Sequence, residues 1–525
     1  MRRIKLTRLA VAVTLLLPLA ATTASAASGP PPRPITLGSV IPAPAEVTPA
    51  GGEPFRLLPG MTITVSAAAR PVADRLAAAL RTPTGFALPV RSGGSGAIDL
   101  RLTNAPDPWL GDEGYRLRIT PAGVALRADR PAGLFAGVQT LLQLLPTEIE
   151  ASSVRPVDWV VPSGEIRDRP RYPYRGAMLD LARHFHPPAD VKRYIDEIAR
   201  FKINFLHLHL ADDQGWRIEI KSWPRLATVG GGPGTGVRGI GGGYLTQDDY
   251  RDLVRYAAER YVTIVPEIDM PGHVNAAQVA YPELTCDGVA PRPRTDIRVG
   301  YSSLCTGTEI THRFAEDVIR ELAALTPGPY LHIGGDEAHS TRHEDYLAFE
   351  ERVLPLVAAY GKVPYGWQEI AAAPGASGAV VQFWNPEGES APTAAAVAHG
   401  AHVVLSPADR TYLDMQYDLL TPGGLHWAGT TEVRDAYDWD PGTRVPGVPE
   451  EGILGLEAPL WSETLRDLGD IEFQAFPRLA AIAELGWSPR QRHDWLSFRE
   501  RLGAYAPRWI RRGVHFYRSP QVRWS

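Results

Sequence analysis

The stretch Leu331-His332-Ile333-Gly334-Gly335-Asp336-Glu337 passes within a few residues from apolar to glycine-rich to acidic. The run from Tyr330 to Ile333 predicts a short buried strand, which the two glycines end. Neighbouring side chains in a regular strand point to opposite faces, so Asp336 and Glu337 can share a pocket only because the strand has stopped. Adjacent carboxylates shift each other's pKa values apart, which allows one to stay protonated while the other stays charged. Taken alone, such a pair is more often a solvated acidic turn.

Residues 1–26 have the pattern of a targeting segment. Four basic residues precede an apolar run from Leu9 to Ala20, and Ala24-Ser25-Ala26 has the small residues of a signal-peptidase site. A membrane anchor is the alternative, but Pro18 interrupts a run that is already short for a membrane span. We therefore expect a secreted, soluble protein, with the export route left open between the Sec and Tat systems.

The 525 residues are enough for two or more domains, and 44% hydrophobic with 22% charged residues is ordinary for a globular protein. The formal net charge is −5, and removing the four positive charges of the targeting segment moves it to −9. This negative balance argues against nucleic acid or an anionic membrane surface as a partner. We therefore expect no nucleic-acid partner and no membrane association.

The chain has two cysteines, Cys286 and Cys305. An even count, close in sequence in a chain expected to be secreted, predicts one disulfide that clamps a loop. Two buried thiols are the alternative.

Residues 27–168, which follow the targeting segment, mix strand and helix patterns. No cluster of potential catalytic groups stands out, so we interpret this region as a supporting α+β domain. The pattern predicts strands at Met61–Val65, Ile98–Leu102, Tyr115–Ile119 and Gly123–Ala128, and amphipathic helices at Ala68–Leu80 and Pro131–Leu145.

From residue 169 to 525 apolar strands alternate with amphipathic helices, a pattern typical of parallel α/β folds. Eight strands over about 350 residues predict a (β/α)8 TIM barrel, and a doubly wound open sheet is the rival. The predicted strands are Gly176–Leu181, Ile203–Leu210, Val262–Ile268, Tyr330–Ile333, Val363–Trp367, Ala379–Trp384, Ala401–Leu405 and Ile453–Ala458.

Polar and aromatic residues follow the predicted strands at their C-terminal ends, where barrels of this kind keep their active sites. Indole rings stack on the apolar faces of sugars, while carboxylates and arginine bind hydroxyls, so this set predicts a carbohydrate enzyme. In strand order the residues are Asp180, Arg183 and His184; His207, His209, Asp212 and Asp213; Glu267, Asp269 and His273; Asp336 and Glu337; Trp367, Gln368 and Glu369; Trp384; Tyr412 and Asp414; and Trp461 and Glu463.

Each of these residues also has a structural explanation. A tryptophan at a strand end is often part of the core, and Arg183 could form a structural ion pair. His207 and His209 share one strand face, so they could be interior packing or, as in metal hydrolases with His-x-His on a barrel strand, a metal pair. No full set of ligands with suitable spacing appears, and we predict that no metal or cofactor is needed.

Four motifs in order resemble those of the family-20 glycoside hydrolases, the β-N-acetylhexosaminidases, and are most similar to secreted actinobacterial members. The resemblance spans nearly the whole chain after the targeting segment and implies a small α+β domain before a (β/α)8 barrel. The motifs are Arg175-Gly176-x-x-x-Asp180-x-x-Arg183-His184, His207-x-His209-x-x-Asp212-Asp213, Pro266-Glu267-Ile268-Asp269-x-Pro271-Gly272-His273 and His332-x-Gly334-Gly335-Asp336-Glu337.

The resemblance implies substrate-assisted catalysis, in which the 2-acetamido oxygen of the sugar attacks the anomeric carbon and forms an oxazolinium ring. It implies that Glu337 is the general acid and base, and that Asp212 and His273 support it. Asp336 and Tyr412 would orient the acetamide group. The residues implied to bind the sugar are Trp367, Trp384 and Trp461 around the acetamide, Arg183, Asp414 and Glu463 at the ring hydroxyls, and Trp427 at the edge of the pocket.

The implied activity is exo-hydrolysis of terminal β-linked N-acetylglucosamine, and also of N-acetylgalactosamine, from chitin oligosaccharides or glycans. Two rivals stay open on the same fold. One is a lacto-N-biosidase type that releases a disaccharide, and the other is a sugar-binding protein without catalysis.

Overall fold

The computed structural model describes residues 34–524, so the predicted targeting segment lies outside the described residues. From Ile35 onward the chain forms one compact unit. Among the residues described, no helix has the length and apolar character needed to cross a membrane.

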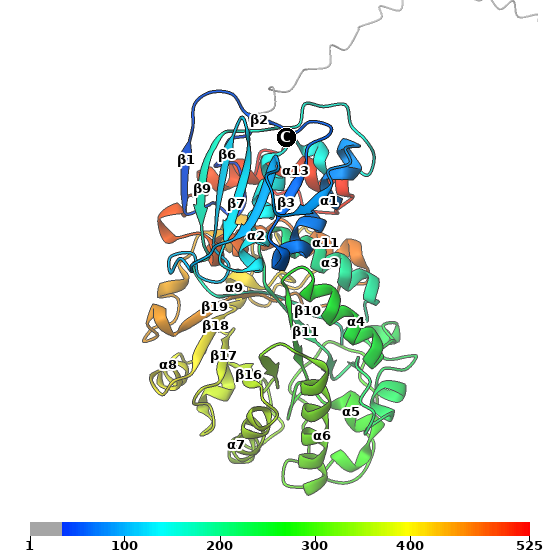
Figure 1. Cartoon of the computed structure of the whole chain (residues 1–525). Helices are drawn as coiled ribbons and strands as arrows, with labels where there is room; N and C mark the ends of the chain where they lie inside the picture. Colours follow the sequence, from blue (N-terminus) through cyan, green and yellow to red (C-terminus); the bar gives the residue numbers. More distant parts are fainter. Residues whose placement is uncertain (1–33, 525) are drawn as a thin grey trace, which may run out of the picture. The chain divides into compact units, whose positions relative to one another are not determined.

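The N-terminal part is a seven-stranded mixed sheet in the order β1-β9-β6-β7-β5-β3-β4, with helices α1 and α2 packed against it (Figure 1). The strands predicted at Tyr115–Ile119 and Gly123–Ala128 are confirmed, and as β6 and β7 they pair antiparallel across a tight turn. Burial alternates along β6, as expected for a strand with one face in the core. The elements are β1 Glu46–Pro49, β3 Ile63–Val65, β4 Val90–Ser92, β5 Ile98–Leu102, β6 Tyr115–Thr120, β7 Gly123–Ala128, β9 Gly164–Asp168, α1 Arg70–Thr84 and α2 Pro131–Leu144.

The rest of the chain confirms the predicted barrel, since eight parallel strands close into a ring. β10 pairs with both β11 and β19, and this closure rules out the open doubly wound sheet. Every predicted strand is present within a few residues of its expected bounds. The strands are β10 Tyr174–Asp180, β11 Phe205–His209, β14 Thr263–Glu267, β15 Tyr330–His332, β16 Val363–Trp367, β17 Val380–Phe383, β18 His402–Leu405 and β19 Ile453–Ala458.

Amphipathic helices follow most of the barrel strands, and their apolar faces turn inward. In α3 one face is buried and consists of Val191, Tyr194, Ile195 and Ile198. The Thr246 hydroxyl and the Asp249 carboxylate form a capping box at the start of α4. The helices are α3 Pro188–Arg200, α4 Gln247–Ala258, α5 Asn275–Ala280, α6 Glu309–Leu325, α7 His343–Ala359, α8 Ala391–Ala398, α9 Ala408–Thr411, α10 Val433–Tyr437, α11 Leu468–Ala475, α12 Arg478–Trp487 and α13 Trp495–Arg512.

The C-terminal helix α13 joins the sheet to the barrel through buried arginines. Arg501 donates to both carboxylate oxygens of Glu484 in α12 and to the Val40 carbonyl. Arg508 donates to the Gln143 and Leu145 carbonyls at the end of α2. The bonds from Arg508 satisfy carbonyls that the end of α2 leaves without a partner in the helix. Charge-assisted hydrogen bonds, as well as apolar contacts, therefore hold the N-terminal sheet against the barrel.

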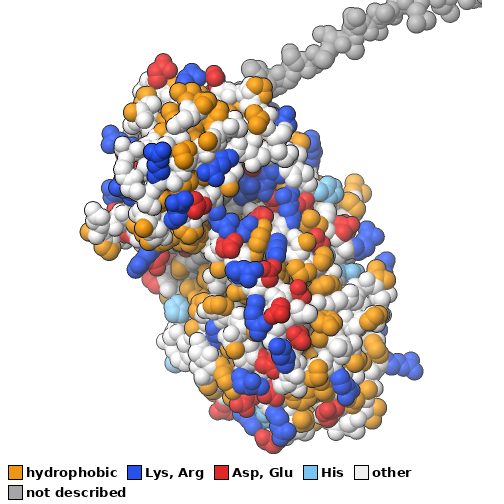
Figure 2. Space-filling view, turned by 45° about the vertical axis from the view of Figure 1, so that its right-hand side comes forward, with side chains coloured by type: hydrophobic (Ala, Val, Ile, Leu, Met, Phe, Trp, Pro, Cys, Tyr) orange, Lys and Arg blue, Asp and Glu red, His pale blue; other side chains and the backbone are white. Residues whose placement is uncertain are grey.

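The face drawn in Figure 2 carries positive and negative side chains side by side rather than one patch of a single sign. Ion pairs on α1 and α4 are of this kind, for example Arg70 with Asp74 and Arg251 with Asp248. Such exposed pairs contribute at most about 1 kcal/mol each, so the fold depends on its cores and not on them.

The predicted disulfide is present: Cys286 and Cys305 are joined, and their separation in sequence is 19 residues. The bridge closes the loop that leaves α5 and returns toward the strand-end face, where the Ser302 hydroxyl donates to Asp213. The bridge therefore constrains a segment that packs against Asp213, one of the acids at the C-terminal ends of the barrel strands.

We expect the double variant Cys286→Ser/Cys305→Ser to lose stability, because opening a loop of this length restores about 3 kcal/mol of chain entropy to the unfolded state. The urea midpoint of unfolding, followed by tryptophan fluorescence, should fall relative to the unmodified protein. Dithiothreitol should lower the midpoint of the unmodified protein similarly and leave that of the double variant unchanged. An equal response of both proteins to reductant would contradict a stabilising bridge.

Candidate active site

The turn after β15 brings the two neighbouring acids together, as the sequence predicted. Gly334 and Gly335 have φ angles of +73° and +95°, which residues with a side chain rarely adopt. A Cβ at Gly334 would lie 1.8 Å from Asp269 Oδ1, so only glycine fits. His273 Nε2 lies 3.7 Å from Asp336 Oδ2 and 3.5 Å from Glu337 Oε2, so both carboxylates face the same imidazole.

Behind this imidazole lies a buried carboxylate with several partners. Asp212 Oδ1 is 3.2 Å from His273 Nδ1, and its Oδ2 is 2.7 Å from Arg183 Nη2 and 2.9 Å from His209 Nε2. Arg183 is held in place by Asp180, which accepts its backbone N–H, and by Gln214 Oε1, which accepts from Nε. Arg183 does form the structural ion pair considered from the sequence, and it also belongs to the cluster.

Burial and charge together set the protonation of this cluster. Burial alone would lower the pKa of His273, but the negative charges of Asp212, Asp269 and Asp336 outweigh it and raise that pKa well above its usual value. Burial and the charge of Glu337 raise the pKa of Asp336 to about 6, against the opposing effect of His273. Although burial opposes it, Arg183 and His273 hold the pKa of Asp212 well below its usual value. The imidazole therefore carries a proton beside one permanent anion and one carboxyl that titrates near pH 6.

Two further acids, Asp414 and Glu463, lie near each other on the residues that follow β18 and β19. Asp414 is buried, and burial together with the charge of Glu463 raises its pKa well above the usual value. Glu463 also interacts electrostatically with Arg183. Several buried polar atoms of the cluster have no hydrogen-bond partner among residues 34–524: Arg183 Nη1, His273 Nε2, Asp336 Oδ1, both carboxylate oxygens of Asp414 and Glu463 Oε2.

Aromatic rings line the same region. The ring centroids of Trp367 and Trp461 are 5.7 Å apart, and those of Trp461 and Tyr412 are 6.2 Å apart. Trp427 lies 5.8 Å from Tyr412 and 6.0 Å from Trp384. Trp367 and Tyr412 are buried, whereas Trp427 is 57% exposed and lies at the edge. The five rings form a continuous wall, and Arg183 joins it to the acids because its Cζ lies 4.8 Å from the Trp461 ring centroid.

The structure thus brings together all twelve residues that the resemblance assigned to catalysis or sugar binding. Unpartnered donors and acceptors beside flat aromatic surfaces suit a ligand with hydroxyl groups and apolar ring faces, which is the chemistry of a sugar.

Two family models cover most of the chain. Residues 172–347 and 339–490 match the catalytic domain of glycosyl hydrolase family 20, and residues 38–169 match domain 2 of the same family. The chain belongs to glycosyl hydrolase family 20. This confirms the resemblance drawn from the four motifs.

Relatives of this family-20 chain are similar over three quarters of its length or more. A β-N-acetylhexosaminidase of Cellulomonas fimi is 42% identical over 490 residues, which cover 93% of this chain and 97% of that protein. A β-hexosaminidase of Akkermansia muciniphila is 34% identical, covering 76% of this chain and 84% of its own. Among solved structures, the Streptomyces plicatus β-hexosaminidase in complex with its product GlcNAc has a TM-score of 0.91 at 55% identity, covering 94% of this chain and 99% of its own.

Three residues at the strand ends of the family-20 chain received no role from the sequence, and the structure gives them contacts. Asp269 Oδ1 accepts from the backbone N–H of Gly335 and so fixes the acidic turn. Glu369 Oε2 accepts from the indole N–H of Trp384, and burial raises the pKa of this acid to about 8. Glu267 is the third, at the end of β14. In the sequence, the only indication that these three residues belong to the site is their position at strand ends. Their partners come from other strands and cannot be identified from local sequence.

The His-x-His pair of the family-20 chain points into the barrel interior, at the end of β11. His207 Nδ1 is 2.9 Å from Glu457 Oε1, and His209 Nδ1 is 2.5 Å from Glu267 Oε2. Both histidines therefore have hydrogen-bond partners inside the barrel, as expected for interior packing, one of the two alternatives considered from the sequence. The groups among residues 34–524 whose atoms are close enough to hold a metal ion are His207, Glu267 and His332; Asp212, Asp213 and His273; and Asp269, His273 and Asp336.

Proposed function

We propose that this chain is an exo-β-N-acetylhexosaminidase that removes terminal β-linked N-acetylglucosamine or N-acetylgalactosamine with retention of configuration. The observation that carries the proposal is the pair Asp336 and Glu337, both facing His273 beside the wall of Trp367, Trp461 and Tyr412. The names of the relatives and the bound product of the Streptomyces plicatus structure support the same substrate class.

In the proposed first step Glu337 donates a proton to the glycosidic oxygen as the bond to the anomeric carbon breaks. Its side chain is 26% exposed, compared with 11% for Asp336, so it is the more open of the two to a leaving group. The acetamido oxygen of the sugar attacks from the opposite face, and the reaction passes through an oxazolinium ring. An internal nucleophile of this kind gains several kcal/mol from proximity.

Asp336 stabilises the positive charge that develops on the acetamide nitrogen. Its Oδ1 is buried and has no hydrogen-bond partner among residues 34–524, so it is available to accept from the acetamide N–H. A fixed anion beside developing positive charge is electrostatic preorganisation, because the protein need not reorganise during the reaction. Tyr412 donates its hydroxyl to the acetamide oxygen and so aims that oxygen at the anomeric carbon.

In the second step Glu337 takes a proton from water, which opens the ring and releases the sugar. The protonated His273, fixed by Asp212, lies 3.5 Å from Glu337 Oε2 and so helps to position this carboxyl group. Arg183, Asp414 and Glu463 hold the hydroxyls of the terminal sugar.

We propose chitin oligosaccharides and glycans as substrates, and a secreted location based on the pattern of residues 1–26. A lacto-N-biosidase type or a sugar-binding protein without catalysis is not favoured by relatives named for hexosaminidase activity. Product analysis on a chitin tetramer separates these possibilities, because they give a monosaccharide, a disaccharide or no product.

The substrate proposal predicts hydrolysis of an aryl N-acetyl-β-glucosaminide and little hydrolysis of the matching 2-hydroxy glucoside, which lacks the internal nucleophile. The ratio of the two kcat/KM values measures how far hydrolysis depends on the acetamide group. EDTA should leave the activity on the N-acetyl substrate unchanged. Equal hydrolysis of both substrates would refute assistance by the acetamide.

The assigned roles predict that Glu337→Gln lowers kcat about 10²- to 10⁴-fold for a substrate with a poor leaving group, because general acid catalysis is lost. A good leaving group such as dinitrophenol should recover much of the first step. Asp336→Asn should instead impair N-acetyl substrates whatever the leaving group. Comparing kcat across the two aryl groups separates the roles, and near-normal turnover by Glu337→Gln would rule out the acid assignment.

The raised pKa of Asp336 predicts the pH dependence of kcat/KM. Asp336 must be negative to stabilise the oxazolinium, and its pKa of about 6 means that it is neutral below that pH. Activity should therefore rise with pH through a midpoint near 6. Asp336→Asn should lack this limb in its residual activity, so a limb that survives in that variant would assign the titration to another group.

A further inference from the structure

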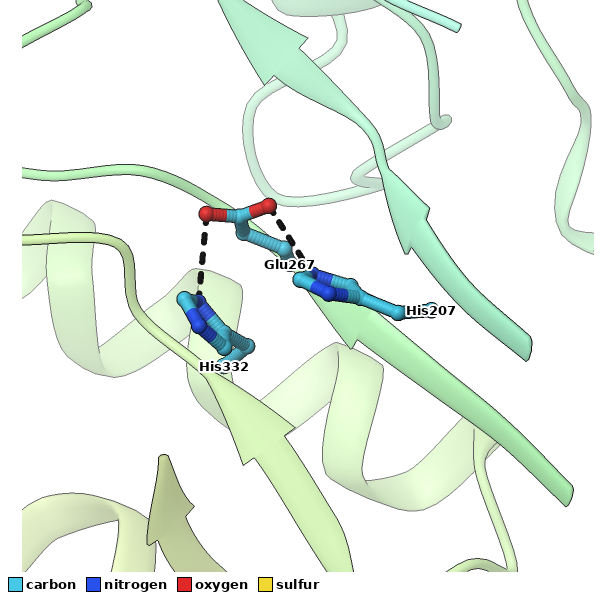
Figure 3. A group of neighbouring side chains, drawn as sticks. All are labelled: His207, Glu267 and His332. Atoms are coloured by element: carbon cyan, nitrogen blue, oxygen red, sulfur yellow. Dashed lines mark ion pairs between the residues drawn. The ribbon is translucent and has the colours of Figure 1, made fainter. Parts of the chain in front are cut away.

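A single buried carboxylate at the end of β14 faces the ring nitrogens of four residues, two of them on β11. Glu267 is fully buried; its Oε1 lies 2.8 Å from Trp367 Nε1 and 3.1 Å from His332 Nδ1, and its Oε2 faces His207 and His209. Figure 3 shows His207 and His332 pointing at opposite oxygens of this carboxylate from β11 and β15, the strands on either side of β14. Glu267 thus links the barrel interior to the aromatic wall.

Glu267 Oε1 accepts from the Trp367 indole N–H at 2.8 Å, and His332 Nδ1 lies 3.1 Å from the same oxygen. His332 Nδ1 accepts from the backbone N–H of Gly334 at 3.0 Å, so it is engaged as an acceptor. The indole nitrogen of Trp367 can only donate, and the geometry of its contact with Glu267 is that of a hydrogen bond. One carboxylate oxygen is therefore committed to holding Trp367.

This bond determines how the Trp367 ring is turned. The other neighbours of the ring are flat rings, with centroids of Trp461 at 5.7 Å, His332 at 5.2 Å and His207 at 6.1 Å, and such contacts tolerate sliding. The indole is 99% buried, so an unbonded N–H would carry a desolvation cost. A directional bond at one corner of the ring sets its plane relative to Trp461 and Tyr412.

We propose that Glu267 is a positioning residue that sets the selectivity of the enzyme for the acyl group on the sugar nitrogen. By fixing the Trp367 ring, it fixes the width of the recess that receives the acetamide methyl group. This inference rests on the proposed function, because it requires that Trp367 line the acetamide recess. Glu267 itself does not touch the sugar in this proposal, and it affects the acyl selectivity only through Trp367.

Two conservative variants separate the reach of Glu267 from its charge. Glu267→Asp keeps the negative charge that faces the histidines but withdraws the carboxylate from Trp367 by one methylene. Glu267→Gln loses the charge but keeps an oxygen that can accept from the indole. Glu457→Asp is the matched control, since Glu457 is equally buried and bonds His207 and Gln382, with no contact to Trp367 among the interactions described.

The measurement is the ratio of kcat/KM for aryl β-glucosaminides that carry an N-acetyl or an N-propionyl group. One extra methylene in a fitted apolar recess costs about 10- to 200-fold, so the unmodified enzyme should favour N-acetyl by a factor in this range. Glu267→Asp should lower this preference about 10-fold. Glu267→Gln and Glu457→Asp should keep it within about 2-fold, whatever their effects on thermal stability.

A preference that is unchanged in Glu267→Asp, or lowered equally in Glu457→Asp, would overturn the proposal. Loss of preference in Glu267→Gln with retention in Glu267→Asp would also overturn it, by showing that charge and not reach is what matters. If Glu267→Asp does not fold, Trp367→Phe removes the indole N–H instead and must lower the preference. An unmodified enzyme that hydrolyses neither substrate would refute the proposed function itself, and that result is distinct from all of these.

Discussion

The ion pairs of Asp212 are the interaction on which the rest of the site depends. This carboxylate follows β11 and contacts Arg183 from the loop after β10, His209 at the end of β11 and His273 from the loop after β14. A buried charge is costly unless it is paired, and removing one partner of such a pair costs about 3–5 kcal/mol. Because its partners come from separate strands, Asp212 fixes the relative positions of loops that the barrel alone would leave loosely related. His273, aligned in this way, then meets the acids that follow β15.

The buried acids of the site have protein partners on the side of the barrel interior and lack hydrogen-bond partners, among residues 34–524, on the side of the aromatic wall. Toward the barrel, Glu267 and Asp212 have ring nitrogens or a guanidinium as partners. Toward the aromatic wall, Asp336 and Asp414 keep buried oxygens that have no hydrogen-bond partner in the described part of the chain. The paired acids hold the loops in place, and the acids that face the wall have pKa values raised by burial. The site is thus rigid behind the reacting groups, while the groups themselves stay free to bind.

Much of this could be predicted from the sequence, because the signals were local. Apolar runs gave the eight strands, and the break at Gly334 and Gly335 predicted that Asp336 and Glu337 would share a pocket. The alternatives for Arg183 and Trp367 could not be decided locally, since each is both structural and part of the cluster: Arg183 pairs with Asp212, and Trp367 is buried as a core residue would be. The role of Glu267 was invisible, because its partners come from β11, β15 and β16 and meet only when the ring of strands closes.

The buried polar atoms without protein partners have a consequence for the whole fold. Within residues 34–524, Asp336 Oδ1 and the carboxylate of Asp414 are taken out of water on folding and find no hydrogen-bond partner in its place. A saccharide that supplies the missing partners binds the native state and not the unfolded chain, so it shifts the unfolding equilibrium by mass action, by about 2.7 kcal/mol at one hundred times its dissociation constant. The polypeptide is therefore incompletely stabilised by its own residues, and its resistance to heat and to proteolysis increases with the concentration of the sugar around it.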